Sequence, residues 1–223
     1  MLEAQKVQNV TEPKIALDEM DLAALISSKI CHDVISPVGA INNGLEVLED
    51  ESDDDMRKIA MELVKKSAKQ ASAKLQFCRL AFGAAGSVGA EIDTGDAESV
   101  ARGFVEGDKV TLDWQAPRQL LPKNRVKLLL NLMTIAANAI PRGGRITFVL
   151  SAGSNGPTFT IESQGLNAKL QQQNIDMMLG QSELNVDSHT IQPYFTGLIA
   201  KAAGMKLDVG TQGDIVRIIA TCV

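Results

Sequence analysis

A histidine, an adjacent carboxylate and a proline stand together near the N-terminus as His32, Asp33 and Pro37. An imidazole nitrogen is a nucleophile that can carry a covalent group when it is presented to solvent. A neighbouring carboxylate can orient the ring or take its proton, which raises the nucleophilicity of the free nitrogen. Pro37 lacks the amide that would donate to the Asp33 carbonyl, so we expect it to bend a helix one turn beyond the histidine. The spacing predicts a reactive histidine on a helix; an ordinary surface histidine followed by an ordinary kink is the alternative.

Apolar residues around His32 recur at helical spacing and predict a helix from Asp18 or Asp21, either of which can cap it, to about Leu48. The apolar stripe of this helix consists of Leu22, Ile26, Ile30, Val34, Val38, Ile41, Leu45 and Leu48. With 3.6 residues per turn, His32 points away from the stripe. Apart from Leu25, its own face carries small or hydrophilic residues, namely Ser28, Lys29, Ser36, Gly39 and Asn43. We expect this face to leave room for a docking partner.

A second helix is predicted after the acidic turn 49–55, from about Asp54 to Phe82. Its apolar seam repeats in steps of four and three and consists of Val64, Ala68, Ala71, Leu75, Cys78 and Phe82. The acidic turn lacks the central glycine and distal glutamate of a calcium loop. Two long helices joined by a tight turn form an antiparallel hairpin, and one hairpin cannot bury both seams. We therefore expect a homodimer in which two hairpins form a four-helix bundle.

Folding the hairpin about its turn brings the region near Ala71 beside His32. Lys69 and Lys74 belong to this locally basic stretch, and either could help to hold a phosphoryl group. The alternative is a solvated basic face that attracts acidic partner surfaces.

A small-residue run at 83–89 marks a linker, after which the composition changes. We expect a helix at Asp96–Glu106, a strand at Val110–Trp114 and a long helix from Pro122 to the turn Pro141–Gly144. The remaining strands are expected at 145–150, 157–163, 205–210 and 214–221, with helices near 167–179 and 190–203. The pattern predicts an α/β sandwich with helices on one face of a mixed sheet.

The chain is thus expected to contain four parts: a frayed N-terminus at 1–17, a helical hairpin at 18–83, a linker at 84–95 and a second domain at 96–223. The overall fold class is α+β.

Two parts of the chain resemble histidine kinases and their phosphotransferase relatives. The box His32-Asp33-x-x-x-Pro37 resembles their phosphoacceptor box, and the resemblance implies that His32 accepts a phosphoryl group. The segment Asn131–Gly144 is similar to the Asn-Leu-Leu-x-Asn-Ala box and the following Pro-x-Gly-Gly of their ATP-binding domain. The alternative is an unrelated domain that shares only Pro-x-Gly-Gly at a turn.

The residues that would hold ATP depart from the kinase pattern in all three boxes. Ile135 occupies the position of the magnesium-ligating asparagine, and an isoleucine offers no oxygen to a hard cation. Ser163 replaces the aspartate of Asp-x-Gly-x-Gly, and Asn167 replaces its second glycine. The third box retains a single glycine, Gly197, where close approach to phosphates needs several. We expect no cofactor-binding site and no resident metal.

Composition excludes several other classes. The 223 residues carry a net charge of −5 without a long basic block, and aromatic residues are sparse, so we expect no nucleic-acid partner. Three separated cysteines, Cys31, Cys78 and Cys222, fit reduced thiols, and with only two histidines a zinc site is not indicated. The start has no signal-peptide core and no apolar run is long enough to span a bilayer, so we expect a cytoplasmic protein without a membrane partner.

Hairpin, histidine box and degenerate ATP domain together resemble the ChpT-type histidine phosphotransferases of alphaproteobacteria, over nearly the whole chain. The resemblance implies a dimeric relay protein of a two-component system in cell-cycle regulation. A phosphorylated receiver domain of a CckA-like hybrid histidine kinase would pass its group to His32, with Asp33 as ring orienter or base and Ser36, Pro37, Lys69 and Lys74 as supporting residues. CtrA-like and CpdR-like response regulators would take the group, and the receiver would supply Mg²⁺. An active kinase with an atypical ATP pocket and a non-catalytic receiver-binding adaptor are the alternatives.

Overall fold

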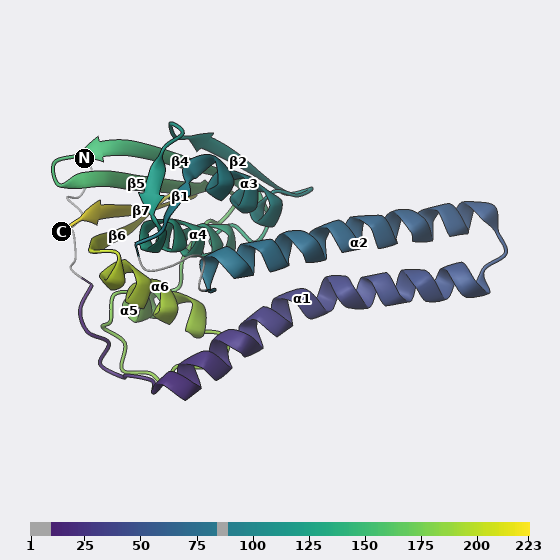
Figure 1. Cartoon of the computed structure of the whole chain (residues 1–223), viewed down its shortest axis with the longest axis horizontal. Helices are drawn as coiled ribbons and strands as arrows, with labels where there is room; N and C mark the ends of the chain where they lie inside the picture. Colours follow the sequence, from purple (N-terminus) through teal and green to yellow (C-terminus); the bar gives the residue numbers. More distant parts are fainter. Residues whose placement is uncertain (1–9, 84–88) are drawn as a thin grey trace.

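The computed structural model describes residues 10–83 and 89–223. Two long helices, α1 (Glu19–Asp50) and α2 (Asp54–Ala81), form an antiparallel hairpin whose closed end projects away from the second domain (Figure 1). The second domain contains β1 (Glu91–Asp93), α3 (Thr94–Val105), β2 (Val110–Gln115), β3 (Leu120–Pro122), α4 (Lys123–Asn138), β4 (Gly144–Gly153), β5 (Gly156–Gln164), α5 (Gln172–Met178), α6 (Ile191–Ala202), β6 (Met205–Gln212) and β7 (Ile215–Cys222).

Aspartate side chains define the start of both hairpin helices. The Asp18 carboxylate accepts from the amide of Asp21, and the Asp53 carboxylate accepts from the amides at the start of α2. The two helices approach closely because small residues line their contact. A Cβ atom added at Gly44 would lie 2.6 Å from Cγ2 of Val64, so a larger residue would push the helices apart. The hairpin was predicted within one or two residues of its observed ends.

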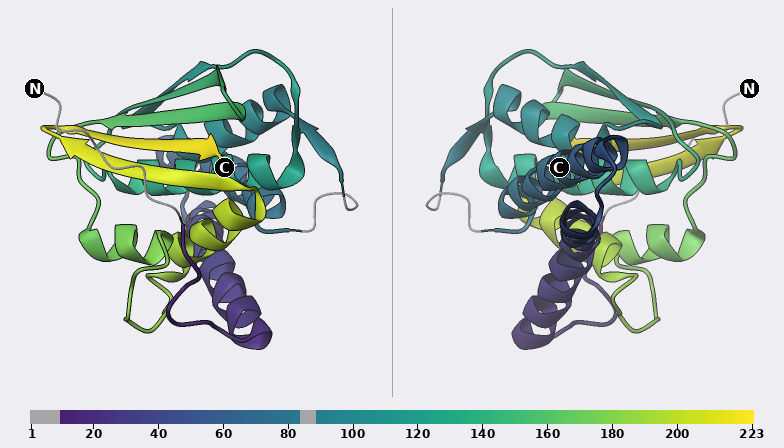
Figure 2. Two further views of the ribbon diagram at one scale, coloured as in Figure 1. Left: turned by 90° about the vertical axis from the view of Figure 1, so that its left-hand side faces the viewer. Right: turned by 90° about the vertical axis from the view of Figure 1, so that its right-hand side faces the viewer.

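The second domain is a five-stranded sheet in the order β2-β4-β5-β7-β6, with a parallel β2–β4 pair and antiparallel pairing elsewhere. Buried and less buried residues alternate along β4, β5 and β7, so a single face of the sheet is packed. The helices lie against this face, as the end views in Figure 2 show. The predicted α+β fold, a helical hairpin followed by an α/β sandwich, is confirmed.

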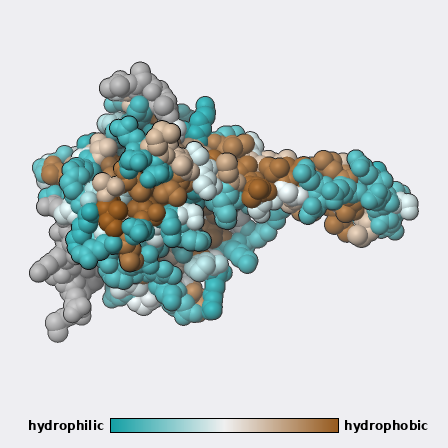
Figure 3. Space-filling model, turned by 90° about the horizontal axis from the view of Figure 1, so that it is seen from below, coloured by the Kyte–Doolittle hydropathy of each residue, from teal (hydrophilic) through white to brown (hydrophobic). Residues whose placement is uncertain are grey.

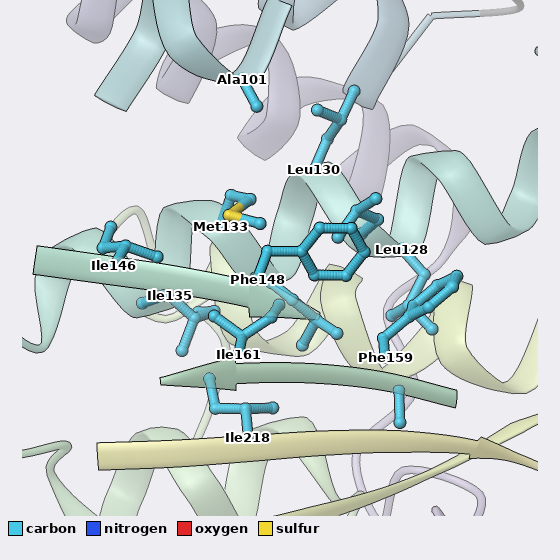
Figure 4. Close-up of a cluster of buried hydrophobic side chains, with 14 of the residues drawn as sticks. Ala101, Leu128, Leu130, Met133, Ile135, Ile146, Phe148, Phe159, Ile161 and Ile218 are labelled. Carbon is cyan, nitrogen blue, oxygen red and sulfur yellow. The ribbon is translucent and has the colours of Figure 1, made fainter. Parts of the chain in front are cut away.

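The core lies between α4 and the sheet. Phe148 and Ile161 point from the strands toward Leu130, Met133 and Ile135 of α4 (Figure 4). The same cluster of buried residues extends to Phe77 and Ala81 at the end of α2. The last two turns of α2 are therefore packed into the second domain, and this packing anchors the hairpin that carries His32.

Two features differ from the sequence-based expectations. The described part of the N-terminal segment expected to be frayed, residues 10–17, crosses α5 and α6: the Thr11 amide donates to the carbonyl of Leu179 at 3.1 Å, and the Leu17 amide donates to the Tyr194 hydroxyl at 3.1 Å. Strands β1 and β3, which were not predicted, pair within and beyond the expected linker 84–95. Residues 84–88 of that linker lie outside the described residues. Over the described ranges, no helix is both long and apolar enough to span a bilayer.

Candidate phosphotransfer site

His32 lies on the outer side of α1, where its side chain is 87% exposed. The neighbouring residues leave this surface open, since Ser36 is exposed one turn later and a Cβ atom added at Gly39 would meet nothing within 4 Å. Nδ1 of the imidazole lies 3.5 Å from Oδ1 of Asp33. A carboxylate at this nitrogen favours the tautomer with the proton on Nδ1, which leaves the lone pair on Nε2 toward solvent.

Asp33 is held at both its side chain and its main chain. The Lys29 ammonium, one turn earlier on α1, donates to Oδ2 of the carboxylate at 2.8 Å, and both side chains are about four-fifths buried, with exposed fractions of 18% and 21%. The Lys74 ammonium, on α2, donates to the Asp33 main-chain carbonyl at 2.7 Å. That carbonyl would normally receive the amide of residue 37, but Pro37 has none.

The other residues expected to support the site occupy different places. Lys69 is exposed and lies five residues before Lys74, which at 100° per residue turns it away from Asp33. Cys78 is buried between the two helices, one turn beyond Lys74. Burial raises the pKa of its thiol to about 11, helped by the negative charge of Asp33 and opposed by Lys29 and Lys74. The structure thus brings Asp33, Lys74 and Pro37 together beside His32, with Ser36 on the same open face, whereas Lys69 lies apart.

In the second domain, Ile135 and Ser163 stand at positions that correspond to the first two ATP boxes, and both side chains are buried. Ile135 is 3% exposed and points into the core between α4 and the sheet (Figure 4). Ser163 is 1% exposed, and its hydroxyl donates to the carbonyl of Ala136 at 2.9 Å. The side chains at these two positions therefore lie in the contact between α4 and the sheet, where they present no ligand to a metal or an adenine.

Asn131, at the first position of the same box, is fully buried and joins three elements. Its side-chain amide donates to the carbonyls of Ala81 and Lys127 at 3.1 and 2.8 Å, and its Oδ1 accepts from the Gln192 amide at 2.7 Å. These bonds tie the end of α2 to α4 and α6. Within the described part of the chain, Oε1 of Gln192 is buried without a hydrogen-bond partner, so the bond to Asn131 is the one that holds this side-chain amide there.

The remaining departures have local structural causes. Asn167 is exposed with φ at 58°, and its amide donates to the Asp214 carboxylate at 2.9 Å, which fixes the turn after β5. Gly197 lies on α6 against the end of α5, where an added Cβ atom would come within 2.3 Å of the Met178 carbonyl oxygen. This glycine permits helix packing; it lies apart from the buried pair formed by Ile135 and Ser163.

Sequence reasoning missed two of the contacts that build these sites. Lys29 was placed on the histidine face, but its pairing with Asp33 was not recognised, although their spacing of four residues is a known signal for a helical ion pair. The Asn131–Gln192 bond joins residues 61 apart in the chain, and no local pattern indicates it.

Comparison with known proteins agrees with this architecture. A family model described as the histidine phosphotransferase C-terminal domain matches residues 94–215. The chain is 48% identical over 204 residues to the protein phosphotransferase ChpT of Brucella abortus (strain 2308), and the match covers 91% of this chain and 96% of that relative. A solved structure of a bacterial phosphotransferase is 44% identical, with a TM-score of 0.85 over 95% of this chain and 100% of the other. The chain belongs to the ChpT-type histidine phosphotransferases.

Proposed function

We propose that the protein relays a phosphoryl group through His32, from the receiver domain of a CckA-like hybrid histidine kinase to the aspartate of CtrA-like and CpdR-like response regulators. The observation that carries this proposal is the exposure of His32 on an open helix face, with a carboxylate at Nδ1. A receiver has to bring its phosphorylated aspartate to the imidazole, and the small residues Ser36 and Gly39 on this face leave room for it.

The chemistry follows from the position of Asp33. With the proton held on Nδ1, Nε2 attacks the phosphorus of the receiver's acyl phosphate. The N–P bond forms, the P–O bond to the receiver carboxyl breaks, and the receiver aspartate leaves as a carboxylate. Transfer to a response regulator reverses these bonds with a second carboxylate as the nucleophile. Mg²⁺ comes with the receiver, and this chain contributes a positioned nucleophile, so proximity is its main catalytic effect.

A homodimer is part of the proposal, because the hairpin is incompletely covered. Ten of the fourteen exposed large hydrophobic side chains among the described residues lie on α1 or α2. They are Met20, Ile35, Val38, Leu45, Val47, Met56, Ile59, Met61, Leu63 and Leu75. Figure 3 shows such brown residues along the projecting hairpin. A second hairpin packed against the first would cover much of this surface in a four-helix bundle.

The proposal excludes transfer from ATP. Buried Ile135 and Ser163 support this, since neither a metal oxygen ligand nor an adenine acceptor is presented at those positions. The active-kinase alternative requires a nucleotide site elsewhere, and the adaptor alternative requires that His32 never carries phosphate.

The experiment is a transfer assay with two donors, magnesium-ATP alone and a phosphorylated receiver domain, followed by location of the label. His32→Ala is the test variant, and His189→Ala is the matched control because it removes the other histidine of the chain. We expect label from the receiver only, in wild type and His189→Ala but not in His32→Ala. His32→Ala should fold normally, since substitution of such an exposed side chain changes stability by less than about 0.5 kcal/mol.

Each alternative predicts a different result. Label from ATP alone would identify a kinase, and receiver binding without any label on the chain would identify an adaptor. Label that persists in His32→Ala would place the acceptor at another residue.

A further inference from the structure

The main-chain carbonyl of Asp33 is in an unusual position for a carbonyl inside a helix. Pro37 deprives it of its helical donor, although the carbonyl lies in the contact between α1 and α2 rather than in open water. A buried acceptor without a donor is unfavourable. The Lys74 ammonium on α2 supplies the missing donor, at 2.7 Å from the carbonyl oxygen. The bond spans 41 residues and joins the two helices at the level of the histidine.

The same residue, Asp33, is the one that contacts the imidazole. Its Oδ2 is occupied by Lys29, so Oδ1 is the oxygen that faces Nδ1 of His32. Fixing the main chain through Lys74 and the carboxylate through Lys29 restricts the aspartate at both ends. The direction of Oδ1, and with it the orientation of the ring, therefore depends on a lysine that does not itself touch the imidazole.

We infer that Lys74 is a positioning residue for phosphoryl transfer: it replaces the helical donor that Pro37 removes and thereby holds Asp33, and through it His32, in the geometry for attack by Nε2. The inference rests on the proposed role of His32. It assigns to Lys74 a main-chain acceptor on α1, so the residue acts before any phosphoryl group arrives. Lys69, which has been placed on another side of α2, has no part in it.

The surroundings of Lys74 suit this role. Cys78, one turn further along α2, is buried and keeps its proton, because burial raises the pKa of its thiol to about 11. Lys74 donates to the Asp33 carbonyl at 2.7 Å, while the Asp33 carboxylate is paired with Lys29 at 2.8 Å. The ammonium is therefore directed to the carbonyl rather than divided among several acidic partners.

The test variant is Lys74→Met, which keeps the length of the stem and removes the donor. The expected result is about a tenfold slower transfer from a phosphorylated receiver, the usual effect of losing one hydrogen bond that involves a charged group. Lys74→Arg retains a donor and should stay within about twofold of wild type. Lys58→Met is the charge-matched control, because Lys58 is 75% exposed and its ion pair is with Asp55 on its own helix. All variants are compared in the same oligomeric state.

A second measurement combines Lys74→Met with a substitution of Pro37. Pro37→Ala restores an amide that donates to the Asp33 carbonyl, so in this background Lys74→Met should slow transfer by less than about twofold. The tautomer of His32, read from nitrogen-15 chemical shifts of the imidazole, should change in Lys74→Met and return in the double variant. A lysine that merely packs between the helices would weaken folding equally in both backgrounds and leave the tautomer unchanged.

The outcomes separate this inference from the proposed function. Wild-type protein that accepts label, with Lys74→Met as fast as Lys58→Met and an unaltered tautomer, overturns the role of Lys74 and leaves the relay intact. Wild-type protein that accepts no label overturns the relay. In that case the role of Lys74 is still decided by the tautomer of His32 and by the loss of stability that Lys74→Met causes in the wild-type and Pro37→Ala backgrounds. Equal effects of Lys74→Met in both backgrounds refute the inference.

Discussion

Asn131→Leu should destabilise the protein strongly, although it keeps the number and branching of the side-chain heavy atoms and lies in the box that resembles a nucleotide site. The asparagine is fully buried, and its three hydrogen bonds hold α2, α4 and α6 together. Leucine would remove the bonds that the Gln192 amide and the Ala81 carbonyl make to Asn131 and leave both groups without a partner among residues 10–83 and 89–223. The Lys127 carbonyl is not counted, because it accepts from its own helix as well.

The magnitude follows from the two orphaned groups. Each buried donor or acceptor left without a partner costs about 1–3 kcal/mol, so we expect a loss of about 2–6 kcal/mol in the free energy of unfolding. A domain of this size is stable by about 5–15 kcal/mol, so the loss is a large fraction of the total and should appear as a large shift of the unfolding midpoint. The second change Gln192→Leu removes the orphaned donor together with an oxygen that already lacks a partner. The double variant should therefore recover about 2 kcal/mol relative to the sum of the single changes.

Urea unfolding followed by circular dichroism measures all four proteins of this cycle, at one protein concentration so that association contributes equally. The reasoning is refuted by a loss below about 0.5 kcal/mol in Asn131→Leu, the range of changes that remove no buried partner. Full additivity with Gln192→Leu would also refute it, because the two side chains would then not depend on each other.

Three further predictions concern packing, pH and assembly. Gly197→Ala should destabilise the protein by about 2 kcal/mol, because the new Cβ atom would approach the Met178 carbonyl. Gly39→Ala should stabilise it by about 1 kcal/mol, because its new Cβ atom meets nothing within 4 Å. Thermal unfolding of the two variants measures both changes. The pKa of the Cys78 thiol is raised from 9.0 to about 11, so the folded state disfavours the thiolate. Below pH 9.0 this group should leave stability unaffected. As pH rises toward 11, stability should fall by up to about 3 kcal/mol relative to Cys78→Ala, and parallel pH profiles of the two proteins would contradict this. Leu45→Glu, on the exposed apolar surface of α1, should weaken the homodimer about tenfold or more in light scattering across a dilution series; an unchanged mass would contradict the proposed bundle.

Local signals were sufficient to predict the hairpin and most strands. Asp18 caps α1 as expected, and the strands expected at 145–150, 157–163 and 214–221 are found as β4, β5 and β7, whose residues alternate between buried and less buried because one face of the sheet is packed. Strands β1 and β3 have only three residues each, too few to show a period, and they pair across nearly thirty residues. The N-terminal segment was expected to be frayed on composition, but its contacts lie on α5 and α6, more than 160 residues away.

The candidate site was predictable in its residues but not in its bonds. Helical geometry placed His32 outward and the Lys74 region beside it, since both depend on spacing and on the position of the turn. The acceptor of Lys74 is the Asp33 carbonyl, which is available because Pro37 has no amide to donate to it. The sequence does not show this bond, because it joins two helices whose packing is known only from the structure. Lys69 and Lys74 were equivalent in the sequence, and the rotation of α2 separates them.

Two of the departures from the ATP boxes, Ile135 and Ser163, lie together in the core. Ile135 fills the space between α4 and the sheet, and the Ser163 hydroxyl bonds to the α4 main chain beside it, so the two substitutions complete each other inside the core. A carboxylate restored at position 163 would be buried beside the Ala136 carbonyl, where both groups are acceptors and no donor has been described. Asn131, the residue that still matches the first box, is occupied by Gln192 and by the end of α2. The segment that resembles the first kinase box thus joins the second domain to the end of α2, the second helix of the hairpin that carries His32.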